Sequence, residues 1–252
     1  MKTRSTMKFS GLCAGLLALA LLQGCATGPN PRDPFEPFNR SVSRFNEGLD
    51  EAIVKPVAQV YQDVLPSPVR TGVNNFFANL TDVWSFVNNV LQAKPQAAAE
   101  SWMRFNVNTL FGLGVLDWAS EMGIERHKED FGRTLAHWGV ASGPYLVLPV
   151  LGPSTVRDTA ALVVDTKGDL VMQVDNVSVR NSLYALRAVD LRASLLRAGE
   201  VLDQAALDKY SFTRDVYLQR RGVVFESNGD EPERYDLPEP PEPPAAAPAV
   251  TQ

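Results

Sequence analysis

The sequence predicts an all-α domain, and three observations lead to that prediction. Apolar side chains recur at spacings of three and four residues through most of residues 34–225, which is the period of an amphipathic helix. No run of alternating β-branched residues is long enough to indicate a sheet, and the best strand fragment, 162–164, has only three residues. Proline and glycine interrupt the pattern repeatedly, so we expect helices joined by irregular Gly/Pro-rich loops.

The first 25 residues have the pattern of a lipoprotein signal. A basic start precedes an apolar segment of 14 residues from Phe9 to Leu22, short of the roughly 20 that a spanning helix needs. Residues 22–25 (Leu-Gln-Gly-Cys) resemble a lipobox, so we expect residues 1–24 to be removed and Cys25 to carry the lipid. Ala26, rather than an aspartate, follows, which implies a lipid anchor on the periplasmic side of the outer membrane. An ordinary secretory signal is the alternative.

Charge and cysteine content exclude several classes of partner. Three of the 24 basic residues and none of the 29 acidic ones precede Cys25. Removal of residues 1–24 would therefore change the formal charge of the chain from −5 to −8. An acidic chain without a basic run has no electrostatic footprint for nucleic acid. Cys13 lies in the segment to be removed, and Cys25 is consumed by lipidation. We therefore expect no disulfide, no metal site and no cofactor.

Composition also sets the domain boundaries. Residues 226–252 contain seven of the 18 prolines and seven acidic residues, a composition that predicts a disordered tail. Residues 25–33 are rich in Gly, Pro and Asn and indicate a short lipidated linker. The remaining segment, 34–225, is expected to form a single domain.

Four amphipathic helices are expected in chain order. The first has apolar residues spaced by three or four, and Pro56 should end or kink it: Phe38, Val42, Phe45, Leu49 and Ile53. The second lies between Pro68 and Pro95 and is rich in asparagine but nearly free of charge, which suits a partly wet interior: Val69, Val73, Phe76, Leu80, Trp84, Val87 and Leu91. A third spans about 184–202, with charges that indicate a solvated side, and a fourth spans about 209–221. Each apolar stripe by itself is most simply the core face of a helix bundle.

Two charge-free segments depart from the pattern of a soluble bundle. Residues 134–156 form a run of 23 residues with no formal charge that contains three prolines and three glycines. Each interior proline costs a helix about 3 kcal/mol, so this run cannot be a regular spanning helix. Residues 105–116 form a second such run of 12 residues. Irregular backbone at membrane depth is tolerated where it borders a cavity, so both runs favour a protein in one leaflet with an interior passage. A soluble domain with a rigid apolar loop is the alternative.

The chain lacks the residue patterns of an enzyme. His127 and His137 are its two histidines, and they do not form a metal-binding pair. Ser142 and Ser154 lack the Gly-x-Ser-x-Gly elbow of a lipase. We expect no catalytic residue, a structural ion pair at Arg157–Asp158, and a packed or interfacial role for His137.

A long ordered set of residues resembles the MlaA (VacJ) family of outer-membrane phospholipid-transport lipoproteins over about residues 33–221. The matching elements include Asp33-Pro34-Phe35-Glu36, Phe38-Asn39-Arg40, Phe45-Asn46, Lys55-Pro56, Arg104-Phe105, Phe131-Gly132-Arg133-Thr134-Leu135, Gly143-Pro144-Tyr145, Arg157-Asp158, Arg214, Tyr217 and Gln219-Arg220. Arg133, Ala136 and Lys209 depart from the usual Gln, Gly and Pro of the family.

The resemblance implies a helical, ring-like domain embedded in the inner leaflet of the outer membrane. Such a protein removes mislocalised phospholipids from the outer leaflet through an amphipathic channel, which maintains lipid asymmetry. The implied partners are phospholipid, a trimeric outer-membrane porin and a soluble periplasmic phospholipid carrier. The alternatives are a structural or adhesive lipoprotein without transport and a lipid hydrolase.

The uncharged polar residues and the Gly-rich turns supply our candidates for the lipid path. Asn88 lies on the second expected helix, and Asn108, Gly112 and Gly114 lie in the charge-free segment 105–116. In the charge-free run they are Gly139, Ser142, Gly143, Pro144 and Tyr145.

Overall fold

The computed structural model describes residues 33–222 as helices and one two-stranded sheet. The elements are α2 (Glu36–Leu49), η1 (Asp50–Val54), α3 (Lys55–Val64), α4 (Ser67–Leu91), α5 (Pro95–Gly112), α6 (Trp118–Glu121), α7 (Phe131–His137), β1 (Tyr145–Leu148), β2 (Gly152–Thr155), α8 (Val156–Gly168), η2 (Leu170–Gln173), α9 (Val177–Ser194), α10 (Leu196–Ala205) and α11 (Lys209–Arg220). The expected signal peptide, Cys25, the tail at 226–252 and all of the linker except Asp33 lie outside the described residues.

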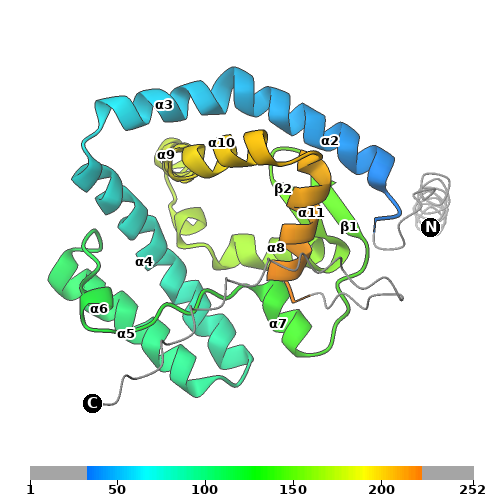
Figure 1. Ribbon diagram of the computed structural model, residues 1–252. Helices are drawn as coiled ribbons and strands as arrows, with labels where there is room; N and C mark the ends of the chain where they lie inside the picture. Colours follow the sequence, from blue (N-terminus) through cyan, green and yellow to red (C-terminus); the bar gives the residue numbers. More distant parts are fainter. Residues whose placement is uncertain (1–32, 223–252) are drawn as a thin grey trace, which may run out of the picture.

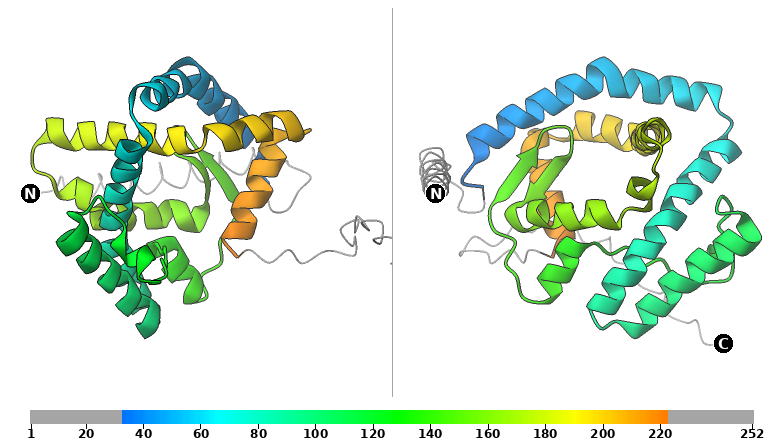
Figure 2. Two further views of the ribbon diagram at one scale, coloured as in Figure 1. Left: turned by 60° about the vertical axis from the view of Figure 1, so that its left-hand side comes forward. Right: turned by 180° about the vertical axis from the view of Figure 1, so that it is seen from behind.

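The elements are arranged around a centre, which confirms the prediction of a ring-like helical domain (Figure 1). α2, η1 and α3 form a long arc, and α4 continues from its end. α7 and α8 lie across from the arc, whereas the hairpin and the start of α11 lie beside α2. α5 packs on α4, and α9 contacts both α3 and α4 (Figure 2). Asp33 connects the first and last helices of the ring, because its buried carboxylate accepts hydrogen bonds from Asn39 of α2 and from Tyr210 of α11.

The first expected helix ends at Leu49, before Pro56, and the arc bends where it passes through η1 into α3, in agreement with the expected end or kink (Figure 1). η1 is a short π-helix in which the amide of Lys55 donates to the carbonyl of Asp50. Pro56 then falls in the first turn of α3, where a missing backbone N–H costs little. The wider π-turn therefore carries the chain from one α-helix into the next.

The apolar stripe of the arc faces outward, which corrects the expectation of a bundle core. Phe45 and Ile53 are 57% and 56% exposed, whereas Asn39 and Ala58 are fully buried. The buried residues of α4 are also mostly polar: Phe77, Asn79, Asp82, Ser85, Asn88 and Asn89. Its apolar stripe does not face outward throughout, because Leu80 and Trp84 line a cavity inside the ring. The period of the sequence locates the apolar face of a helix, but it does not tell which medium that face meets.

A β-hairpin forms where no strand was expected. β1 and β2 pair antiparallel, with Tyr145 opposite Thr155 and Leu148 opposite Gly152. The fragment at 162–164, which looked most like a strand, lies inside α8. Both strands are only four residues long, too short for a period-two pattern to be visible.

The segment expected as one helix over 184–202 is divided in two. α9 ends at Ser194 and α10 begins at Leu196, with a turn at Leu195. The fourth helix is confirmed as α11. Within residues 33–222, no helix is both long and apolar enough to cross a membrane.

Candidate functional site

Three adjoining cavities follow one another through the middle of the ring, and we call them together the central passage. Their volumes are about 290, 640 and 660 Å³. The first and second share Thr81, Arg187 and Lys128 as lining residues. The second and third share Asp130, Arg221 and again Lys128. Lys128 is thus the one described residue that lines all three.

The walls of the passage come from elements far apart in the sequence. α4 supplies Leu80 and Trp84, α8 supplies Leu162, and α11 supplies Phe212 and Val216. The segment that precedes α7 adds the charged residues Lys128 and Asp130 to the lining. The passage is therefore amphipathic.

A single glycine allows two walls to meet. Gly168, the last residue of α8, lies against the ring of Trp84, and a Cβ atom at this position would be 2.3 Å from the indole. The indole N–H of Trp84 in turn donates to Asp165 of α8 at 2.7 Å. Close contact and hydrogen bond together fix α8 against α4.

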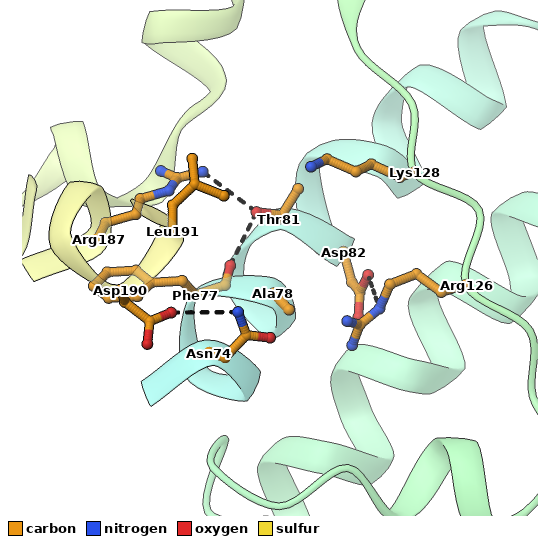
Figure 3. Close-up of a pocket in the computed structure, with 10 residues that line it drawn as sticks. All are labelled: Asn74, Phe77, Ala78, Thr81, Asp82, Arg126, Lys128, Arg187, Asp190 and Leu191. Atoms are coloured by element: carbon orange, nitrogen blue, oxygen red, sulfur yellow. Dashed lines mark hydrogen bonds and ion pairs between the residues drawn. The ribbon is translucent and has the colours of Figure 1, made fainter. Parts of the chain in front are cut away.

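Ion pairs hold several charged side chains against the walls. Arg187 of α9 lies 2.8 Å from Asp169, and Arg221 lies 2.6 Å from Asp130. Burial raises the pKa of Asp165, although the amide of Phe131 and the indole of Trp84 donate hydrogen bonds that act to lower it. Around the first cavity, Arg187 donates to Thr81 and Asn74 donates to Asp190 (Figure 3).

A buried charge network lies beside the passage, and sequence reasoning missed its role. Arg104 of α5 is 1% exposed, and its guanidinium lies 2.7 Å from Asp117 and 3.6 Å from Asp82. Asp82 also pairs with Arg126, as Figure 3 shows. Burial raises the pKa of Asp82 to about 6, although Arg126 and Arg104 act to lower it. Arg104 matched the family motif, but residue spacing alone did not show that its partners lie on α4 and before α6.

The two asparagines among the predicted path residues are fully buried in polar contacts. Asn88 accepts a hydrogen bond from the hydroxyl of Thr134 at 2.7 Å, which joins α4 to α7. Asn108 donates to Asp117 at 3.0 Å and accepts from the amide of Ala119 at 2.9 Å, which joins α5 to α6. In this structure both side chains connect helices.

The predicted glycines shape turns at two places in the ring. Gly112 ends α5 at a position where a Cβ atom would lie 3.1 Å from Leu116 and 3.2 Å from Trp118, and Gly114 follows at φ 76°. The other candidates lie on the connection from α7 to β1 and at the first residue of β1: Gly139, Ser142, Gly143, Pro144 and Tyr145. Tyr145 is buried in the small aromatic core with Tyr210 and Tyr217. None of the nine candidates lines the central passage, and their contact with lipid stays a prediction.

The serines considered for hydrolysis have no catalytic surroundings in the described structure. The hydroxyl of Ser142 donates to the carbonyl of Gly143, and that of Ser154 donates to the carbonyl of Thr155. Neither hydroxyl contacts a histidine or a carboxylate among the hydrogen bonds of residues 33–222. His137 is exposed at the end of α7, and His127 contacts Glu100 at 2.5 Å. Arg157 and Asp158 form the expected structural ion pair at 2.9 Å.

The fold and the passage together define a mostly helical protein of inverted polarity, which encloses charged and amide groups and turns large apolar side chains outward. The chain belongs to the MlaA lipoprotein family, whose model matches residues 31–223. It is 35% identical over 230 residues to the intermembrane phospholipid transport system lipoprotein MlaA of Escherichia coli, covering 87% of this chain and 90% of the relative. The MlaA lipoprotein of Haemophilus influenzae is 33% identical over 225 residues, covering 84% and 89%.

A solved structure has the same fold. It is described as "Structural basis for maintenance of bacterial outer membrane lipid asymmetry" and superimposes with a TM-score of 0.67 at 34% sequence identity. The match covers 76% of this chain and 98% of that chain.

Proposed function

We propose that this chain removes mislocalised phospholipids from the outer leaflet of the outer membrane, conducts them through the central passage and delivers them to a soluble periplasmic carrier. This retrograde transport maintains the lipid asymmetry of the membrane. The relatives support the proposal, because two are intermembrane phospholipid transport lipoproteins and the solved structure concerns the maintenance of outer-membrane lipid asymmetry.

The inverted distribution of polarity is the observation that carries the proposal. A phospholipid has a charged headgroup and two apolar chains, so a path for it needs polar groups and apolar groups side by side. The largest cavity provides both, since basic residues such as Arg133 and Arg220 share its walls with Leu202, Phe212 and Val216. Conduction of lipid requires no covalent step, which agrees with a transport component rather than an enzyme.

We further propose that the domain is embedded in the inner leaflet of the outer membrane. Large apolar side chains are exposed on several elements, among them Val64 at the end of α3, Phe111 near the end of α5 and Val163 on α8. Removing such surface from water contributes about 25 cal/mol per Å². An exposed Trp138 supports the same location, because indole favours the membrane interface. No helix has to span the bilayer for this arrangement.

The partners and the processing of the chain complete the proposal. By resemblance to the family, we propose that the ring lies beside a trimeric porin. We also propose that the lipid on Cys25 directs the protein to the outer membrane. We propose that the signal peptide is 1–24, the lipidated linker 25–33, the helical domain 34–225 and the tail 226–252. The intact mass of the purified protein tests the processing site, and limited proteolysis tests the domain boundaries.

The transport proposal is tested in cells that lack the protein. Labelled phospholipid should accumulate in the outer leaflet, and a plasmid copy of the wild-type chain should reverse this accumulation. Normal lipid asymmetry in the deletion cells would contradict the proposal. Fatty-acid release from phospholipid by the purified protein, lost in Ser142→Ala or Ser154→Ala, would instead support the hydrolase alternative.

A further inference from the structure

The largest cavity of the passage has one basic wall and one apolar wall. The basic wall contains Lys128, Arg133, Arg220 and Arg221, and Asp130 is the acidic residue among them. Apolar residues of α10 and α11 line the same cavity, among them Leu202, Phe212 and Val216. At about 660 Å³ the cavity has the size of a ligand site, which is typically about 300–1,000 Å³.

The one carboxylate of this wall is already paired. Both oxygens of Asp130 accept hydrogen bonds from Arg221, at 2.8 and 2.6 Å. One oxygen also accepts from the backbone amide of Arg133 at 2.9 Å, as the N-cap of α7. Asp130 therefore neutralises Arg221 and has little capacity left for the other cations.

The remaining three cations have no carboxylate partner among the described residues. Arg133 donates to the backbone carbonyl of Arg220 at 3.2 Å, which brings these two residues together. No ion pair or hydrogen bond of the Lys128 ammonium or of the Arg220 guanidinium is present within residues 33–222. Figure 3 shows the Lys128 side chain reaching toward Thr81 across the neighbouring cavity with no bond drawn to it.

The electrostatic surroundings of Lys128 show an excess of positive charge. Burial among the passage walls lowers the pKa of Lys128, and nearby Arg187 and Arg220 lower it further, whereas Asp130 acts to raise it. The side chain nevertheless stays accessible to water inside the passage. Unpaired cations in a partly enclosed space create a strong attraction for an anion.

We propose that Lys128, Arg133 and Arg220 bind the phosphate group of a glycerophospholipid whose acyl chains lie along Leu202, Phe212 and Val216. This inference rests on the proposed function and assigns its headgroup site to particular residues. Lysine and arginine form charge-assisted hydrogen bonds to phosphate oxygens. Because Lys128 lines all three cavities, it is placed to keep contact with the phosphate while the lipid moves from one cavity to the next.

The test compares two lipids with the same chains, one with and one without a phosphate. The full-length lipoprotein in micelles of an uncharged detergent is titrated with fluorescent phosphatidylglycerol and with the matching diacylglycerol. The test variants are Lys128→Gln and Arg220→Gln, singly and combined. The matched controls are Lys167→Gln and Arg197→Gln, which change exposed basic residues that do not line the passage.

We expect the double variant to bind phosphatidylglycerol about tenfold more weakly, because it loses charge-assisted hydrogen bonds. Diacylglycerol binding and both control variants should be unchanged. The folded structure should survive, since neither side chain has a described partner to lose.

Three results would overturn the inference. If wild type and double variant bind phosphatidylglycerol equally, the phosphate site lies elsewhere while the proposed function stands. If a large excess of inorganic phosphate displaces the lipid, the cluster is a general anion site. If the wild-type protein binds neither lipid, both the inference and the proposed function fail.

Discussion

At the scale of single residues, the buried guanidinium of Arg104 is central to the stability of the ring. Besides Asp82 and Asp117, it reaches the backbone carbonyl of Ile124 and the hydroxyl of Ser120. It therefore connects α4, α5 and the loop that follows α6. Its Nε has no hydrogen-bond partner and lies 3.6 Å from Asp82, so the two carboxylates compensate its charge. A buried arginine is tolerated only when its charge is paired.

Replacing Arg104 by glutamine should destabilise the protein by roughly 3–5 kcal/mol, because Asp82 and Asp117 would lose a buried counter-ion. Chemical unfolding followed by circular dichroism in detergent measures the change. Arg44→Gln is the control, since Arg44 is exposed and its guanidinium donates only to Ser41 on its own helix. Equal stability of the two variants would show that the network contributes little.

The network also predicts a pH dependence of unusual sign. Burial raises the pKa of Asp82 from 3.8 to about 6, so between these values the folded state binds more protons than the unfolded state. The contribution of Asp82 to stability therefore falls as pH rises through this window. The unfolding free energy of wild type minus that of Asp82→Asn should decrease by roughly 3 kcal/mol from about pH 3 to pH 7.

Asp117 provides the comparison with opposite sign. Burial acts to raise the pKa of Asp117, but hydrogen bonds from Ser120 and Asn108 and the nearby Arg104 lower it to about 2. Its stabilising contribution is present above its ordinary pKa of 3.8 and is lost as pH falls. The unfolding free energy of wild type minus that of Asp117→Asn should rise with pH. Parallel curves for the two variants would refute this assignment.

At the scale of elements, α2 completes the hydrogen bonding of the β-hairpin. The amide of Asn39 donates to the carbonyl of Tyr145 at 3.1 Å and accepts from the N–H of Val147 at 2.8 Å. Asn46, two turns later, does the same for Leu148 and Val150 at 3.0 and 2.7 Å. The two asparagine side chains therefore make the backbone hydrogen bonds that a third strand would make along the free edge of β1.

Asn39→Ala should destabilise the protein by roughly 2–4 kcal/mol, because buried backbone groups of β1 lose their partners. Hydrogen exchange at the amide of Val147 should accelerate in this variant. Faster exchange at this amide in particular indicates loss of the edge contact rather than a general loosening of the protein. Asn106→Ala is the control, since its side chain donates only to the carbonyl of Trp102 on its own helix. Unchanged protection of Val147 would exclude the proposed role of Asn39.

These contacts explain how much of the fold the sequence could predict. A helical period is visible locally, so the helices of the arc, α4 and α11 could be predicted from residues such as Phe38, Phe45 and Leu80. β1 depends on hydrogen bonds to Asn39, 106 residues away in the chain, and no local pattern reports such a contact. The passage could not be predicted from the sequence for the same reason, because Lys128, Arg187 and Arg220 come together only when the ring folds.

At the scale of the whole molecule, the outward apolar surface changes what the proposed lipid on Cys25 would have to do. Two or more acyl chains can anchor a soluble domain by themselves, at about 0.8 kcal/mol per buried CH₂. A ring that exposes Phe45, Ile53, Phe111 and Val163 already favours an apolar surrounding. In an embedded ring, the lipid chiefly determines which membrane and which leaflet the protein enters.

Cys25→Ser should therefore mislocalise the protein without making it freely soluble. Fractionation of the membranes should show loss from the outer membrane, because the variant lacks the acyl chains that direct its delivery. The purified variant should still require detergent, since the apolar surface within residues 33–222 is unchanged. Retained outer-membrane localisation would contradict the role assigned to the lipid. A variant that is freely soluble without detergent would contradict the embedding of the ring and return Cys25 to the role of a simple tether.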